Sequence, residues 1–150
     1  MIVVLDAEPV GILANSKRPS HMSACRRWVY GLLNRGVSVW LSEVSDFEVR
    51  RELIRRNSSQ GLFLLDQFAT IVEYIEITTP AMRRAAALWA EARNRGIPTA
   101  DNRTLDADVI LAAQAQLLRE ATGDRVVVAT SNIRHLAQFV DARPWQEIDG

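Results

Sequence analysis

The chain has 150 residues, of which 48% are hydrophobic and 24% charged, and its acidic and basic side chains balance to a formal net charge of zero. This length predicts one compact domain over residues 1–150 with a substantial hydrophobic core. The zero net charge argues against attraction of nucleic acid by the whole surface, so any such contact has to come from a local patch. Because no apolar run is long enough to span a bilayer, we expect no membrane partner.

The N-terminal end and the cysteine content indicate a cytoplasmic protein. The first six residues carry neither a basic region nor a cleavage-site pattern, so the sequence predicts no signal peptide. Cys25 is the single cysteine and has no partner for an internal disulfide. A reducing compartment is therefore the expected setting.

In the first half of the chain, short apolar runs alternate with helical segments. Residues 2–5 are β-branched and apolar and end in Asp6, a pattern that predicts a buried strand. We expect Arg35 and Gly36 to stop the first long helix. The predicted elements are helices at 20–34 (capped by Ser20 or Ser23), 43–57 (capped by Ser42) and 62–72, and strands at 37–41 and 74–77.

In the second half, the clearest helix is predicted over residues 80–95. Thr79 is its expected cap, Pro80 takes the first helical position and Gly96 follows its end. Helical spacing predicts an inner face of Met82, Ala85, Ala86, Trp89 and Ala92 or Arg93. We then expect a loop at 96–103, a helix at 105–119 that is apolar on almost every side, a strand at 125–130, a short helix at 132–139 and a last strand at 144–148.

This alternation of strands and helices predicts the fold class. The strongest strands are continuous apolar runs, which is typical of strands buried on both faces. The sequence therefore predicts an α/β fold with a mainly parallel central sheet flanked by helices. In such sheets ligands bind beyond the carboxyl ends of the strands.

Polar residues are expected to gather at that edge of the sheet. Carboxylates that converge there repel one another unless a cation is bound, and their oxygen atoms favour Mg²⁺ or Mn²⁺. The candidates are Asp6 at the end of the first strand, Glu48 in the helix after the second, Asp106 and Asp108 at the start of the apolar helix, and Asn132 after the strand at 125–130.

Each candidate also has a structural interpretation. Asp6 can form a turn or cap a helix, and Glu48 can belong to a solvated helix face with ion pairs. Asp106 and Asp108 can cap their helix and complement its dipole. They point in nearly opposite directions, and both head apolar stripes, so burial does not choose between them. Asn132 taken alone is best explained as a helix cap, and the functional hypothesis therefore depends on the whole set.

Four segments of the chain resemble, in order and approximate separation, the four blocks of PIN-domain nucleases. They span nearly the whole sequence and lie at residues 3–6, 41–51, 108–115 and 127–136. The closest resemblance is to the toxin nucleases of VapBC-type toxin–antitoxin pairs. It implies a PIN-like three-layer sandwich and a Mg²⁺-dependent ribonuclease, often a homodimer, that is often held inactive by a small antitoxin.

The resemblance also implies roles for individual residues. Asp6, Glu48 and Asp108 correspond to the first three acids of the family and would hold the metal ion, with Glu48 acting through water. Asn132 stands at the fourth position, which is often acidic, so a second metal would be held more weakly. Asp106 can supply the missing charge. The implied reaction is metal-assisted hydrolysis of a phosphodiester bond.

Further residues are candidates for binding the RNA substrate. Thr130 and Ser131 can hydrogen-bond a phosphate or orient Asp6. Arg51 and Arg55 lie on the same helix face as Glu48 and form the best local basic patch. Their structural interpretation is a solvated helix face paired with Glu52. His135 is expected near the site but not as a metal ligand.

Two other classes of function compete with a nuclease. One is a PIN-fold module that binds RNA or a protein partner with weak or no catalysis, which Asn132 favours. The other is a different parallel α/β enzyme. A haloacid-dehalogenase-like phosphatase needs a second aspartate two residues after the first, where this chain has Glu8, and the first loop lacks the glycines of a nucleotide-binding fold.

Overall fold

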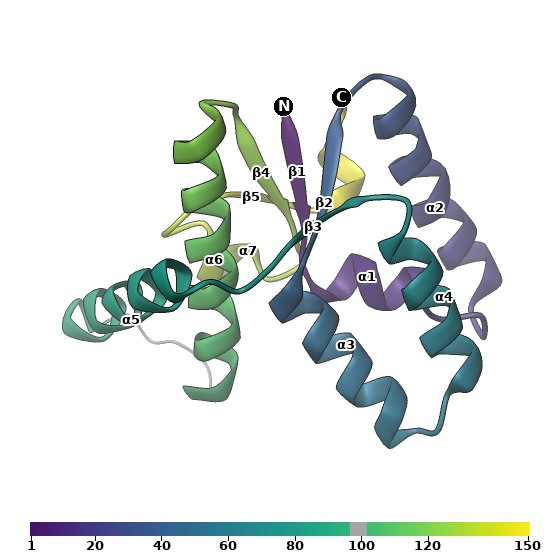
Figure 1. Cartoon of the computed structure of the whole chain (residues 1–150), viewed down its shortest axis with the longest axis horizontal. Coiled ribbons are helices and arrows are strands. Elements are labelled where there is room, and N and C mark those ends of the chain that lie inside the picture. Colours follow the sequence, from purple (N-terminus) through teal and green to yellow (C-terminus); the bar gives the residue numbers. More distant parts are fainter. Residues whose placement is uncertain (97–101) are drawn as a thin grey trace.

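The computed structural model describes residues 1–96 and 102–150, and within these the strands form one parallel sheet. Its order is β3-β2-β1-β4-β5, and all four neighbouring pairs are parallel (Figure 1). This confirms the predicted α/β class and extends "mainly parallel" to every pair of strands described. The strands are β1 (Ile2–Leu5), β2 (Ser38–Ser42), β3 (Glu73–Ile75), β4 (Val126–Ala129) and β5 (Asp141–Arg143).

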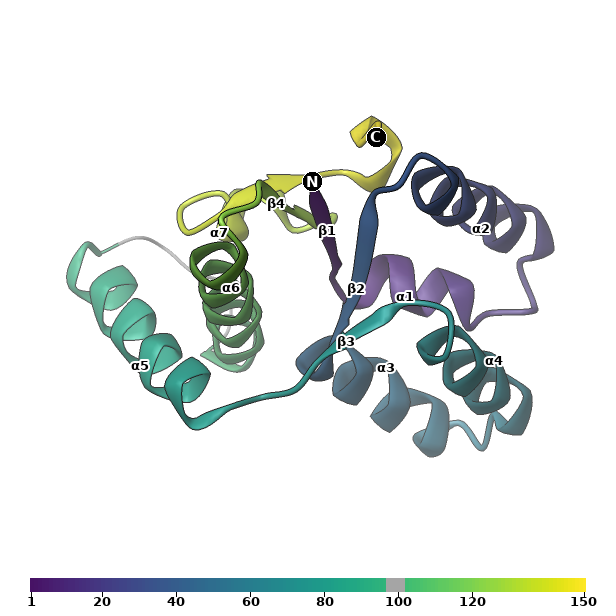
Figure 2. The ribbon, with the colours of Figure 1, turned by 45° about the horizontal axis from the view of Figure 1, so that its top comes forward.

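Helices cover both faces of the sheet and produce three layers (Figures 1 and 2). Successive residues of β1 enter different cores: Val3 and Leu5 pack with α1 to α4, whereas Ile2 and Val4 pack with α5 and α6. None of the described helices is long and apolar enough to cross a bilayer. The helices are α1 (Ala7–Leu13), α2 (Pro19–Asn34), α3 (Glu43–Arg55), α4 (Ser59–Ala69), α5 (Thr79–Asn94), α6 (Asn102–Thr122) and α7 (Ile133–Leu136).

The register of the central strands sets where the site can form. Leu5 of β1 aligns with Leu41 of β2 and with Ala129 of β4. β1 and β4 are wholly apolar and buried, and β2 is largely buried, so the polar residues at the ends of the three strands emerge together at one edge. Asp6 and Thr130 are therefore placed side by side by strand register alone.

Several predictions of helix starts are wrong. Helix α1 was not predicted, and it starts because the Asp6 side chain accepts a hydrogen bond from the backbone N–H of Ala7. Helix α2 begins at Pro19, whose fixed φ suits the first helical position, so neither Ser20 nor Ser23 is its cap. The predicted cap of α3 is confirmed, because the Ser42 side chain accepts from the N–H of Ser45.

Helix α5 begins one residue earlier than expected, and of its predicted inner face only Ala85 and Ala92 are buried. Its cap is Thr78, not Thr79, since the Thr78 side chain accepts a hydrogen bond from the N–H of Ala81. Met82 and Trp89 are 46% and 39% exposed, which contradicts their predicted place on the inner face. Helix α5 packs against α6 through a mainly small-residue face that lets the two helices approach closely; the buried residues of α5 are three alanines and one leucine, Ala81, Ala85, Leu88 and Ala92.

The remaining differences concern element boundaries. The strand predicted at 144–148 is wrong: β5 ends at Arg143, before Pro144, and residues Trp145–Glu147 form a 3-10 helix that buries Trp145. Helix α4 starts three residues earlier than predicted, where the Ser58 side chain caps it. Helix α6 extends beyond the predicted 105–119 at both ends. Of the loop expected at 96–103, residues 97–101 lie outside the described residues.

Candidate active site

The carboxyl edge of the sheet brings three acidic side chains into one electrostatic cluster. Asp6 follows β1 directly, Glu48 projects from α3, and Asp108 lies in α6. The charge of Asp6 acts on both other carboxyls, and the charge of Glu48 acts on Asp108. Three of the four predicted acids are thus brought together from segments more than 40 residues apart in the chain.

Asp6 is held by hydrogen bonds to both of its carboxylate oxygens. The N–H of Ala7 donates to Oδ1 at 2.7 Å, and the Thr130 hydroxyl donates to Oδ2 at 2.6 Å. Thr130 is fully buried, so its hydroxyl faces Asp6 and not solvent. Of the two roles predicted for Thr130, this geometry favours orientation of Asp6. Ser131, the next residue, is exposed beside the cluster.

Asn132 links Asp108 to Thr130, the residue that holds Asp6. Its side-chain Nδ2 donates to Oδ2 of Asp108 at 2.9 Å, and its backbone N–H donates to Oγ1 of Thr130 at 2.8 Å. Asn132 occupies the cap position of α7, but its side chain makes no capping hydrogen bond. His135 Nδ1 lies 3.5 Å from the same Asp108 oxygen. The sequence indicated Asn132 by its place after a strand and by the family resemblance, and His135 by the resemblance. The contacts of both residues to Asp108 are seen only in the fold.

The environment raises the pKa of all three carboxyl groups. Burial raises the pKa of Asp6, although hydrogen bonds from Thr130 and Ala7 partly oppose it. Burial and then the charge of Asp6 raise the pKa of Glu48. Burial, and then the charges of Asp6 and Glu48, raise the pKa of Asp108 to about 7. A hydrogen bond from Asn132 lowers this pKa and so partly opposes the rise. This mutual repulsion is what a bound cation relieves.

The donor atoms at this edge fit a hard divalent cation. Asp6, Glu48 and Asp108 offer carboxylate oxygens, the ligands that Mg²⁺ prefers. As the side chains stand, no three metal-ligating residues in the described ranges 1–96 and 102–150 are close enough to hold one ion jointly. Mg²⁺ keeps several of its waters and is commonly bound through one or two carboxylates, so a partly open protein cage is compatible with it.

Asp106 is not part of the carboxylate cluster that surrounds Asp108. Its side chain is exposed and lines a hollow together with Glu48 and Arg51. This separation follows from the helix, because residues two positions apart point in different directions. Burial in the fold, which the sequence pattern did not resolve, therefore distinguishes Asp108 from Asp106.

The two arginines predicted to bind substrate lie in different surroundings. Arg51 approaches Glu48, with 3.9 Å between guanidinium and carboxylate, and shares the hollow beside it. Arg55 lies one turn further along α3 and donates two hydrogen bonds to Glu52. The arrangement at Arg55 matches the alternative interpretation, a solvated ion pair. The arrangement at Arg51 instead places its guanidinium next to the carboxylate cluster.

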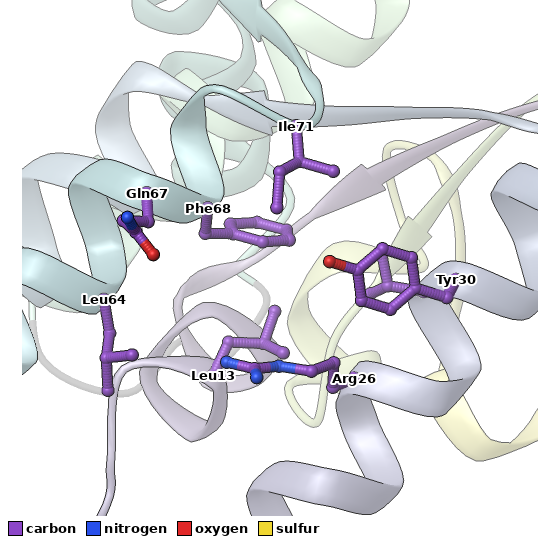
Figure 3. A pocket seen from close by; sticks show the side chains of 8 residues that line it. Leu13, Arg26, Tyr30, Leu64, Gln67, Phe68 and Ile71 are labelled. Atoms are coloured by element: carbon purple, nitrogen blue, oxygen red, sulfur yellow. The ribbon is translucent and has the colours of Figure 1, made fainter.

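A second hollow lies between α2 and α4, away from the carboxylates (Figure 3). Tyr30 and Phe68 face each other across it, and Leu13 of α1 contributes to its floor. Arg26 is the charged residue among those that line it in the described part of the chain. This hollow contributes nothing to the site at the sheet edge.

Known structures share this fold over almost the whole chain. VapBC2 from Rickettsia felis, solved bound to a DNA fragment from its promoter, aligns with a TM-score of 0.70 and 18% identity over 97% of this chain and 99% of that chain. VapBC-1 from nontypeable Haemophilus influenzae aligns with a TM-score of 0.66 and 13% identity over 98% and 100%. No protein-family model matches the sequence, and no curated protein matches it significantly.

These likenesses concern the fold. The chain has the PIN-like architecture of chains in the two VapBC structures, with a parallel five-stranded sheet and helices on both faces within its described residues. The resemblance noted in the sequence is confirmed at this level. The activity, the metal and the partners have to be argued from the site.

Proposed function

We propose that this chain is a Mg²⁺-dependent endoribonuclease and the toxin of a toxin–antitoxin pair, with residues 1–150 forming one PIN-like domain. The observation that carries the proposal is the cluster of Asp6, Glu48 and Asp108 at the carboxyl edge of the sheet, where the charge of Asp6 raises the pKa of Glu48 and the charges of Asp6 and Glu48 raise the pKa of Asp108. Partly buried acids that perturb each other's charge are typical of functional sites. The PIN-like fold supports the same conclusion.

In this proposal each residue of the cluster has a distinct task. Asp6 and Asp108 hold Mg²⁺, with Mn²⁺ as a substitute, and Glu48 contributes through water. A bound Mg²⁺ supplies Lewis acidity and neutralises charge at the phosphodiester. Thr130 and Asn132 are positioning residues, because their hydrogen bonds fix the carboxylates of Asp6 and Asp108.

The charges around the cluster suit an RNA substrate. Arg51 places a guanidinium beside Glu48, where it can contact a phosphate that approaches the metal. Ser131 is exposed at the same edge and can donate a hydrogen bond to phosphate. Arg55 is a weaker candidate because Glu52 already accepts from it. Asp106 can add negative charge at the outer rim of the site.

The neighbouring structures support a protein partner. Both are VapBC assemblies, and one was solved on promoter DNA. We propose that this chain likewise pairs with a small antitoxin, acts in the cytoplasm and forms a homodimer. Purification with the product of an adjacent small reading frame would test the pairing, and sedimentation would test the dimer.

A second candidate function is a PIN-fold module that binds RNA or a partner without turnover. The observation that favours it is Asn132, which fills the fourth position with an amide that already donates to Asp108. An amide adds no negative charge, so the site has fewer anionic ligands than four acids would give. The two candidates differ in whether phosphodiester bonds are broken.

Cleavage of structured RNA by the purified protein tests the proposal. The assay compares Mg²⁺, Mn²⁺ and EDTA, and compares wild type with Asp6→Asn and Asp108→Asn. Glu120→Gln is the matched control, since Glu120 is an exposed acid on the same helix as Asp108 and pairs with Arg84. Metal-dependent cleavage that both Asp variants lose and the control keeps is the expected result. Equal inertness of all four proteins, with RNA binding retained, would favour the binding module.

A further inference from the structure

Asn132 presents an amide donor, and no negative charge, to one oxygen of Asp108. Its side-chain nitrogen lies 2.9 Å from Oδ2 of Asp108, and Nδ1 of His135 lies 3.5 Å from the same oxygen. The Asp108 side chain is 7% exposed, so little of its carboxyl group reaches solvent. Nitrogen atoms from the cap of α7 and from α7 itself therefore cover the Oδ2 side of Asp108.

The segment around Asn132 contains no acid that could take its place. Residues 130–140, which lie between β4 and β5, include neither Asp nor Glu. The next acid along the chain, Asp141, pairs with Arg125 and Arg143. Anionic ligands for the site have to come from other parts of the fold.

Two further acids near the cluster line hollows of their own. Asp106 is exposed and shares the hollow between α3 and α6 with Arg51. Glu8 lines a separate hollow together with His21 of α2. Among the described residues that line these hollows, Asn132 belongs to neither. Neither acid therefore replaces the charge that Asn132 lacks.

A second cation next to Asp108 would meet the donors of α7. In two-metal sites the ions lie about 3.5–4 Å apart, so both have to find acids within the same cluster. An ion on the Oδ2 side would face the positive end of the Asn132 amide dipole. Displacing that amide would break a hydrogen bond to a buried carboxylate. Three carboxylates also leave a net negative charge around one divalent cation, whereas two such cations would reverse its sign.

We propose that Asn132 restricts this site to one divalent cation and positions Asp108 for it. This inference rests on the proposed function and concerns the ion count of that same site. The amide takes the side of Asp108 where a second ion would need an acid, and its hydrogen bond holds the Asp108 carboxylate in one orientation. The backbone N–H of Asn132 also donates to Thr130, which orients Asp6. One residue thus fixes two of the three acids around a single ion.

Electron paramagnetic resonance of Mn²⁺ added to the metal-free protein tests the ion count, because two neighbouring Mn²⁺ ions give a spin-coupled spectrum that a single ion lacks. The proteins are wild type, Asn132→Asp, Asn132→Ala and Asn57→Asp. Asn57→Asp is the matched control, since it makes the same change of charge at an exposed position between α3 and α4. Asp tolerates the φ of 52° found there. Thermal unfolding with and without Mn²⁺ checks that each protein is folded.

We expect wild type and Asn57→Asp to bind one Mn²⁺ without spin coupling. Asn132→Asp adds an acid ligand and should show the coupled spectrum, and Mn²⁺ should raise its unfolding temperature more than that of wild type. Asn132→Ala should stay uncoupled and bind its ion about 10-fold more weakly, because it loses the hydrogen bond that orients Asp108.

A coupled spectrum in wild type, or none in folded Asn132→Asp, overturns the inference. If Asn132→Asp does not fold, wild type and Asn132→Ala decide the matter. Spin coupling in either of them overturns the ion count, and unchanged Mn²⁺ affinity in Asn132→Ala overturns the positioning role.

The outcomes separate this inference from the proposed function. If wild type cleaves RNA in Mg²⁺ but shows the coupled spectrum, the nuclease stands and the one-ion site falls. If wild type binds a single Mn²⁺ and leaves RNA intact in Mg²⁺, the one-ion site stands and the chain is a binding module. If wild type binds no Mn²⁺, the inference falls together with the metal-dependent mechanism.

Discussion

Two glutamates one turn apart on α3 lie in opposite electrostatic environments. Glu52 accepts two hydrogen bonds from Arg55 and lies near Arg56, and these contacts lower its pKa. Burial and the charge of Asp6 raise the pKa of Glu48. The charge of Arg51 lowers this pKa, but its guanidinium lies 3.9 Å from the Glu48 carboxylate. The same residue type on the same helix is thus matched with cations at one position and crowded with anions at the other.

This difference separates structural acids from the proposed functional ones. Asp46 shows the structural pattern too: it is buried, yet it accepts hydrogen bonds from Arg50 and from the Tyr74 hydroxyl. Asp6 and Asp108 instead lie close to further acids, with neutral hydrogen-bond donors beside them. A fold can tolerate that repulsion where a bound cation offsets the negative charges.

The largest expected effect is on catalysis. Asp108→Asn should lower the rate of RNA cleavage about 100-fold or more, because it removes a charge on which metal binding depends. Glu120→Gln, on the exposed side of the same helix, should change the rate less than twofold. Initial rates at saturating Mg²⁺ measure both, and similar losses in the two variants would contradict the distinction between paired and crowded acids.

The pH dependence of stability should follow from the raised pKa of Asp108. In the unfolded chain this carboxyl has an ordinary pKa near 4, whereas in the folded protein the pKa is about 7. As pH rises between these values, the unfolded state loses its proton while the folded state still holds it. The contribution of Asp108 to stability therefore falls over this window.

Asp108→Asn isolates this contribution, because its side chain is neutral at every pH. In EDTA, we expect the variant to gain on the order of 2 kcal/mol relative to wild type between pH 4 and pH 7. Urea unfolding at several pH values measures the difference. A constant difference across the window would mean that Asp108 ionises normally and that the cluster is not repulsive.

The hydrogen bond from Thr130 to Asp6 should have an intermediate effect. Thr130→Val keeps the shape of the side chain but removes the hydroxyl, which costs about 1 kcal/mol of stability. The pKa of Asp6 should rise further, since this hydrogen bond lowers it. We expect about a 10-fold loss of kcat, with KM nearly unchanged, and recovery in Thr130→Ser. Failure of Ser to restore activity would point to packing instead of orientation.

The smallest effect is expected at Glu52. Its carboxylate is an exposed partner of Arg55, and exposed ion pairs contribute little to stability. Glu52→Gln should unfold at nearly the wild-type urea concentration and cleave RNA at a similar rate. Glu48→Gln, one turn away, should lower the rate clearly. Equal rates in the two variants would remove the contrast between these positions.

The sequence was sufficient to place Asp6 and Thr130 at one edge of the sheet. Continuous apolar runs predicted the strands, and parallel strands that end in register bring their successors together. Four expected acids were therefore assigned to one edge, and the fold clusters three of them. Capping rules predicted the start of α3 correctly, because Ser42 was the single candidate for its N-terminal cap.

The remaining features depend on tertiary contacts that a linear pattern does not contain. Asp106 and Asp108 both head apolar stripes, and only the packing of α6 buries Asp108 and exposes Asp106. On α5 the large residues Met82 and Trp89 fit the helical period, yet the packing against α6 buries the residues one position earlier, Ala81 and Leu88. Asn132 has the position of a cap, and its bond to Asp108 crosses 24 residues.

Calorimetric titration of the metal-free protein with Mn²⁺ tests the central claim most directly. The claim is that Asp6, Glu48 and Asp108 are crowded because they share a cation. We predict saturable binding by wild type and by Glu52→Gln, with affinity lost in Asp6→Asn and Asp108→Asn. Binding of equal affinity in all four proteins, or none in wild type, would contradict the claim.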